Sequence, residues 1–191
     1  MIISHKHKFI SLDPPKTGTN YRQNLFWDYG YYVKRLQHAN LIEVKNFFKN
    51  RNVDLHDYFV FTFVRNPWNR YLSYFNWFHR NNGYDRLTHS EFRRFMYNPK
   101  YHRDKYLAFP QSYWFEHRNV MNIDFVGAIE NFKQDMDFVL SKIGINLTLS
   151  DRVENKSDGR LKFHDAYSQD LINFVAKKEE RVIELKGYTC P

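Results

Sequence analysis

The sequence predicts an α/β fold: a three-layer sandwich whose central, mainly parallel sheet carries helices on both faces. Apolar runs typical of strands alternate along the chain with amphipathic segments typical of helices. The run Tyr58–Val64 is continuously β-branched or aromatic, as in a central strand that is covered on both faces. A chain of 191 residues with a hydrophobic share of 42% is large enough for such a core.

Three apolar segments are predicted strands. Phe9–Leu12 is a short run that ends at a pair of prolines, and Tyr58–Val64 ends at Arg65-Asn66-Pro67. Ile123–Gly127 is the third. A helical pattern follows each strand, so we expect the carboxyl ends of these strands to share one edge of the sheet. Ligands bind at that edge in open α/β sheets.

Six segments are predicted helices, because their apolar residues recur every three or four positions. They are Asn20 to about Tyr32, Ala39–Lys49, Pro67 to about Arg80, Ser90–Tyr97, Glu130–Ile143 and a last helix that begins near Ser168. Gly144 is predicted to be a C-cap and Ser168 an N-cap.

We expect a single domain over residues 1–191, because no internal repeat or long linker divides the chain. Residues 83–122 mix charges with aromatics and are expected to form a lid or insert on the acceptor side. Two interpretations of this segment stay open. Its cations and aromatic rings suit a sugar that carries acidic groups, but a solvated helix with its aromatics in the core has the same pattern.

Composition narrows the classes of ligand and the compartment. The formal charge is +8, which favours anionic partners such as nucleotides, acidic glycans, nucleic acids or lipid headgroups. Cys190 is the only cysteine, so no internal disulfide forms. The N-terminal residues lack the apolar core of a signal peptide, and no apolar run approaches the about 20 residues of a membrane span. We expect a cytoplasmic protein without a membrane span. The histidines show no metal-ligand spacing, so no metal is expected.

The segment Pro14-Pro15-Lys16-Thr17-Gly18-Thr19-Asn20 joins the first predicted strand to a helix. Anions bind well at such junctions, because unpaired backbone N–H groups and the helix dipole point at the ligand. Gly18 permits close approach, Lys16 supplies a charge, and Thr17 and Thr19 supply hydroxyls. The glycine follows the lysine instead of preceding it, so the loop is not that of a nucleoside triphosphatase. The expected sandwich is P-loop-like.

A second motif follows the strongest predicted strand. Arg65 stands at the strand end, and Ser73 lies two helical turns further on. A guanidinium binds phosphate in a bidentate way, and a serine hydroxyl adds a donor. Each motif alone is common as plain structure. Their combination predicts one nucleotide site.

With these two motifs the chain resembles the sulfotransferases that use 3′-phosphoadenosine 5′-phosphosulfate (PAPS), most closely the carbohydrate O-sulfotransferase branch. In that family a Pro-Lys-Thr/Ser-Gly-Thr-Thr/Ser loop binds the 5′-phosphosulfate, and a Phe-Val-Arg-Asp/Asn-Pro-x-x-Arg-x-x-Ser element binds the 3′-phosphate. Asn20 departs from the Thr or Ser of the first motif. Ile123–Asn131, Glu154–Ser157 and Tyr167–Tyr188 resemble later family segments. The implied nucleotide-binding residues are Pro15, Lys16, Thr17, Gly18, Thr19, Asn20, Arg65, Ser73, Lys156 and Ser157.

The resemblance implies transfer of a sulfo group to a hydroxyl of a carbohydrate acceptor, an acidic glycan being one candidate. The released product would be adenosine 3′,5′-bisphosphate (PAP). Lys16 is the candidate for stabilising the leaving phosphate. Gln37–Leu41 resembles the family segment that carries the catalytic base, which points to His38. Glu43 and Asp57 are reserve candidates for the base.

Two rival functions fit parts of the pattern. A small nucleotide or metabolite kinase shares the strand–loop–helix phosphate site, but the Walker pattern is absent. A basic nucleic-acid-binding protein would share the charge and the aromatic content. We expect no nucleic-acid partner.

Overall fold

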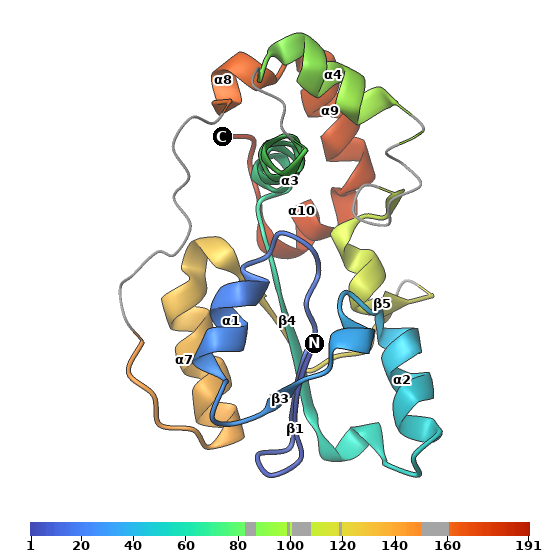
Figure 1. Cartoon of the computed structure of the whole chain (residues 1–191), viewed down its shortest axis with the longest axis vertical. Helices are drawn as coiled ribbons and strands as arrows, with labels where there is room; N and C mark the ends of the chain where they lie inside the picture. The colour runs from blue at the N-terminus through green and yellow to red at the C-terminus, as the bar shows by residue number, and fades with distance from the viewer. Residues whose placement is uncertain (83–86, 99, 101–107, 119, 150–160) are drawn as a thin grey trace. The chain divides into compact units, whose positions relative to one another are not determined.

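The computed structural model describes residues 1–82, 87–98, 100, 108–118, 120–149 and 161–191 (Figure 1). The chain forms two compact units. The first comprises Met1–Val64 and Gln111–Arg152, and the second comprises Arg65–Pro110 and Val153–Pro191.

The first unit is built on a five-stranded sheet with the strand order β3-β1-β2-β4-β7. The strands are β1 Ile2–Ser4, β2 Phe9–Ser11, β3 Tyr31–Tyr32, β4 Phe59–Val64 and β7 Phe125–Ala128. β2, β4 and β7 are parallel, whereas β1 is antiparallel to both β2 and β3. The predicted α/β class and its mainly parallel centre are therefore confirmed. The antiparallel edge was not predicted.

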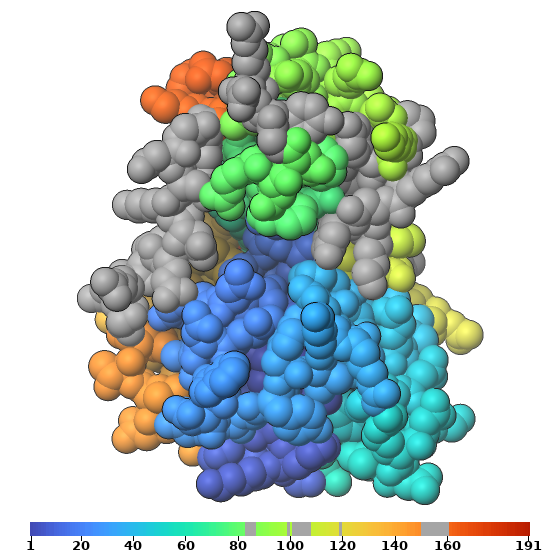
Figure 2. All heavy atoms as spheres, in the orientation of Figure 1, coloured from blue at the N-terminus to red at the C-terminus, as the bar shows by residue number. Residues whose placement is uncertain are grey.

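Helices cover both faces of this sheet. α1 Thr19–Leu25 and α7 Phe132–Ile143 lie on one face and α2 Leu41–Lys49 on the other (Figure 1). Alternation along β4 turns Phe61 and Phe63 towards α7, where they pack with Phe9, Phe26 and Met136. Figure 2 shows the segment from the N-terminus through α2, and residues of α7, on the surface of this unit.

Short elements complete the first unit. Four 3₁₀ turns are η1 Lys34–Leu36, η2 Leu55–Asp57, η3 Gln111–Trp114 and η4 Ile129–Asn131. A hairpin consists of β5 Glu116–His117 and β6 Val120–Met121. The described end of the predicted lid, from Gln111 onward, thus belongs to the sheet unit.

The first predicted helix was too long. The structure ends α1 at Leu25 and places β3 at Tyr31–Tyr32, inside the predicted range. The main chain turns back at Gly30, where a Cβ would come within 2.9 Å of the Ile3 carbonyl oxygen. Pairing of two tyrosines with β1 overrides the helical spacing of the apolar residues in this segment.

The other helices of the sheet unit begin and end close to their predicted bounds. Asn40 forms a capping box with Glu43 at the start of α2, and Gly144 takes the left-handed conformation after α7, as predicted. β7 begins two residues later than its predicted strand, because Ile123 and Asp124 precede the ladder with β4.

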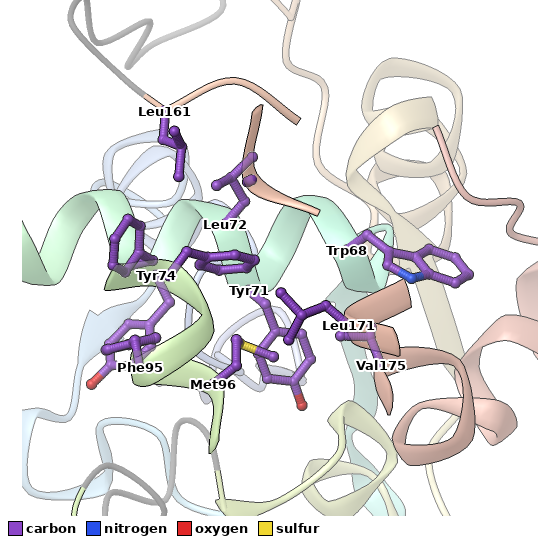
Figure 3. Packing of buried hydrophobic residues seen from close by; sticks show 12 residues of the cluster. Trp68, Tyr71, Leu72, Tyr74, Phe95, Met96, Leu161, Leu171 and Val175 are labelled. Carbon is purple, nitrogen blue, oxygen red and sulfur yellow. The ribbon is translucent and has the colours of Figure 1, made fainter. Parts of the chain in front are cut away.

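The second unit consists of helices in its described part. They are α3 Pro67–Asn81, α4 His89–Tyr97, α8 Phe163–Ala166, α9 Gln169–Lys178 and α10 Glu180–Lys186. Figure 3 shows their core, in which side chains such as Tyr71 and Tyr74 of α3 pack with Phe95 of α4 and Leu171 of α9. Phe92 and Phe95 are fully buried. These two aromatics of α4 therefore serve the core, whereas Tyr97 at the end of the helix is exposed.

A buried ion pair joins α3 to the break between α9 and α10. Arg70 Nη1 lies 2.9 Å from Glu179 Oε1, and the Tyr71 hydroxyl donates to the same oxygen at 3.1 Å. Burial and the charge of Glu179 raise the pKa of Tyr71 well above its usual value. The sequence predicted one last helix. Two are present, because Glu179 leaves the helical path where its side chain turns into the core.

Among the described helices, none combines the length and the apolar character that crossing a membrane requires.

Candidate functional site

The loop after β2 leaves the sheet at the carboxyl ends of the parallel strands. Leu12 N–H still donates to the Phe61 carbonyl oxygen at 2.9 Å, and α1 begins at Thr19. Pro15 is buried in this loop, Lys16 is half-buried, and Asn20 is exposed at the start of the helix. The six predicted loop residues therefore lie together at the sheet edge where α/β proteins bind ligands.

Gly18 has no room for a side chain. Its φ is +72°, and a Cβ would lie 3.1 Å from Ile129 Cδ1 at the start of η4. Lys16 is also left-handed, with φ +67°, whereas Thr17 between them is not. Such alternation turns successive backbone N–H groups towards one side and forms a concave anion site.

Two contacts hold the loop from inside the protein. The Thr17 hydroxyl donates to the Pro14 carbonyl oxygen at 2.7 Å. Arg22 of α1, fully buried, donates to the carbonyl oxygens of Thr17 and, at 3.2 Å, of Leu12. Burial lowers the pKa of Arg22 to about 10, an effect that the charge of Asp13 partly offsets.

Sequence reasoning missed Arg22, although the sequence held a signal. An arginine two residues after a phosphate-type loop needs a specific partner if its side chain is buried, because a buried cation without one is costly.

The buried Thr19 hydroxyl indicates which class of ligand the loop binds. Thr19 Oγ1 has no hydrogen-bond partner among the described residues. A buried polar atom without a partner is costly, and a ligand oxygen would satisfy it. An ammonium group, the Thr19 hydroxyl and backbone N–H groups form a donor set that fits phosphate and sulfate oxygens. The loop residues therefore fit the 5′-phosphosulfate that the sequence motif implies.

His38 lies against the residue that begins this loop. Its Nδ1 is 2.5 Å from the Asp13 carbonyl oxygen, and its backbone N–H donates to Asp13 Oδ1 at 3.2 Å. A carbonyl oxygen only accepts, so Nδ1 carries the proton and Nε2 of the neutral ring carries a lone pair. Trp114 Nε1 donates to the His38 carbonyl oxygen at 3.1 Å. The site thus includes Trp114 and also Asp13, and Asp13 is a residue that sequence reasoning did not assign to it.

The reserve bases lie in less suitable places. Glu43 Oε2 accepts from the Asn40 backbone N–H at 2.7 Å and completes the cap of α2. Asp57 precedes β4, whereas the loop lies at the strand's far end, about 20 Å away for six residues. This geometry favours His38 over both carboxylates.

The remaining predicted residues lie outside the first unit or outside the described residues. Arg65, half-buried, precedes Asn66, the N-cap of α3, and Ser73 lies half-buried within α3. Lys156 and Ser157 fall outside the described residues. In the described parts of the chain, no three His, Cys, Asp or Glu side chains gather as metal ligands do.

Comparison with known proteins identifies the family. The model of a family described as "Sulfotransferase family" matches residues 1–184. An uncharacterized protein of Archaeoglobus fulgidus is 34% identical over 102 residues, which are 53% of this chain and 80% of that protein. No solved structure matches. Because the family model spans almost all of the sequence, this chain belongs to the sulfotransferase family, whose enzymes use PAPS.

Proposed function

We propose that the protein transfers the sulfo group of PAPS to a carbohydrate hydroxyl and releases PAP. The observation that carries this proposal is the loop Pro15–Asn20, which offers a phosphate-type donor set at a sheet edge in a chain of the sulfotransferase family. The predicted cytoplasmic location stays a prediction.

In this proposal each of the two motifs binds a different phosphate group of the nucleotide. Lys16, Thr17, Gly18, Thr19 and Asn20 hold the 5′-phosphosulfate, with Pro15 stiffening the loop. Arg65 and Ser73 hold the 3′-phosphate, and Lys156 and Ser157 lie near the nucleotide. The support for this second set is the family motif in the sequence.

Lys16 has the central electrostatic role. When bound, the donor supplies an activated sulfo group on a phosphate leaving group. Negative charge then grows on the bridging oxygen, and a positioned ammonium stabilises it. Backbone N–H groups of the loop stabilise the same phosphate without moving, because the loop conformation is already set by Arg22 and Thr17.

His38 is the proposed general base. The acceptor hydroxyl gives its proton to Nε2, in place of the long 3.4 Å contact with the Gln37 amide. The Asp13 carbonyl oxygen keeps the proton on Nδ1 and fixes the ring orientation. That arrangement also stabilises the imidazolium that forms, because a carbonyl oxygen accepts better from a charged donor.

Calorimetry with PAP and with ATP plus Mg²⁺ tests the donor half of the proposal. We expect saturable PAP binding and little response to ATP. Gly18→Ala should weaken PAP binding about tenfold or more, because the new methyl group meets Ile129 and strains a left-handed residue.

Gly144→Ala is the matched control. Gly144 has a similar φ of +66° but nothing within 4 Å of a Cβ. This variant therefore introduces the same kind of backbone strain at a position outside the loop. It should leave PAP affinity unchanged. Tight binding of ATP with no response to PAP would instead indicate a kinase.

A further inference from the structure

Arg22 is a buried cation whose side chain, among the described residues, donates to the phosphate loop and to Leu12 just before it. It has 0% exposure, and its guanidinium donates to the Thr17 and Leu12 carbonyl oxygens and lies 3.5 Å from Thr17 Oγ1. Nε has no hydrogen-bond partner among the described residues. The carboxylate of Asp13 acts on it only through its charge.

This placement is costly for the guanidinium. Burial strips the guanidinium of water, which is costly for a charged group. Neutral carbonyl oxygens accept hydrogen bonds from some of its N–H groups but do not neutralise its positive charge. An anion bound at the loop would neutralise that charge.

The contact with Thr17 also sets the direction of a loop donor. In a trans peptide the C=O of one residue and the N–H of the next point in opposite directions. Because Arg22 holds the Thr17 carbonyl oxygen towards the interior, the Gly18 N–H faces away from it. Gly18 is exposed, so that N–H faces the open side of the loop.

We infer that Arg22 is a positioning residue for the 5′-phosphosulfate: it orients the Thr17–Gly18 peptide towards the anion and places a positive charge behind it. This inference rests on the proposed function. It assigns the residue no contact with the nucleotide, so the two ideas can fail separately.

The test measures binding of two nucleotides that differ only in the 5′-phosphate. Wild type, Arg22→Met and Arg22→Lys are titrated with PAP and with adenosine 3′-monophosphate by calorimetry. For Arg22→Met we expect PAP affinity to fall about 10- to 100-fold, the range of a charge-assisted interaction, while adenosine 3′-monophosphate binds as before. Arg22→Lys keeps the charge but loses the two-carbonyl fork, so its loss should be several-fold smaller.

Arg51→Met is the charge-matched control. Arg51 is an exposed arginine of the same unit that stacks on Phe47 at 3.7 Å, so its loss changes the net charge equally but leaves the loop intact. PAP affinity should not change. Thermal melting of every variant checks folding, and if Arg22→Met does not fold, the comparison of Arg22→Lys with wild type carries the test.

Each outcome decides the matter. A loss confined to PAP supports the inference. Equal losses for both nucleotides would reduce Arg22 to a structural residue, and PAP binding within about threefold of wild type in folded Arg22→Met would overturn its role. Failure of the wild type to bind PAP would remove the proposed function itself, and the inference with it.

Discussion

At the scale of single residues, two of the five non-glycine residues with positive φ in the described part of the chain belong to the candidate site. Lys16 and His38 both have positive φ, +67° and +55°, which is uncommon for residues other than glycine. Such strain persists where surrounding contacts hold it, and here Asp13 and Trp114 hold His38 through three hydrogen bonds. The strained backbone at His38 therefore indicates that the surrounding contacts fix the position of the His38 ring.

The general-base role of His38 is tested by His38→Asn. Asparagine tolerates the left-handed conformation better than alanine, so this variant keeps the backbone but cannot take up the proton. We expect PAP affinity within about threefold of wild type and turnover lower by about 10²- to 10⁴-fold. Calorimetry and product mass spectrometry measure the two quantities; His38→Ala should behave alike, with some loss of stability.

Asp57→Asn serves as the control for that experiment. It removes a reserve base from the far end of β4 and should leave turnover unchanged. Normal turnover in His38→Asn, or loss of turnover in Asp57→Asn, would contradict the assignment.

The sequence predicted the loop from Pro15 to Asn20 because residue types in one short segment define a phosphate site. It did not predict Arg22 or Asp13. Their roles are contacts between side chains and carbonyl oxygens of other segments, and such contacts exist only after the chain has folded.

At the scale of elements, the local sequence pattern predicted those helices whose bounds depend on local sequence alone. α2 and α7 have apolar stripes, α2 begins at a capping box and α7 ends at a glycine, and their predicted bounds were within two residues of the observed ones. β1 and β3 are only three and two residues long, too short for a periodic pattern. The break between α9 and α10 depends on Arg70, which is far away in the sequence.

That buried ion pair predicts a large, asymmetric effect on stability. Glu179→Gln leaves the buried guanidinium of Arg70 without its anion and should lower the free energy of unfolding by about 3–5 kcal/mol. Replacing both partners, as Arg70→Met with Glu179→Leu, should recover most of that loss. Denaturant unfolding of the single and double variants measures the effect.

An exposed pair in the same unit provides the comparison. Arg93 and Asp170 form an ion pair with side chains 48% and 45% exposed. Water screens that pair, so Asp170→Asn should shift the unfolding midpoint far less than Glu179→Gln. Equal shifts would show that burial does not govern the strength of these pairs.

At the scale of the whole molecule, the net charge of +8 bears on the acceptor. Some residues of the segment 83–122, which the sequence suggested as a surface for an acidic sugar, have other structural roles. Phe92 and Phe95 lie in the core, and Arg93 pairs with Asp170. Attraction of an acidic acceptor would then come from the summed field of the protein more than from one patch, and such a field weakens as salt is added.

The charge therefore predicts how acceptor choice depends on salt. With saturating PAPS and glycan oligosaccharides of equal length, an acidic acceptor should exceed a neutral one in kcat/KM by about tenfold at low salt. The advantage should shrink to a few-fold near 0.5 M salt, since the screening length is about 10 Å at 0.1 M and shorter above it. Product mass spectrometry measures transfer to each acceptor.

Duplex DNA, added as a competitor that cannot accept the sulfo group, should inhibit only at low salt. If the neutral glycan is preferred at every salt concentration, specific contacts rather than net charge select the acceptor, and if DNA still binds tightly at high salt, the basic surface has evolved for nucleic acid.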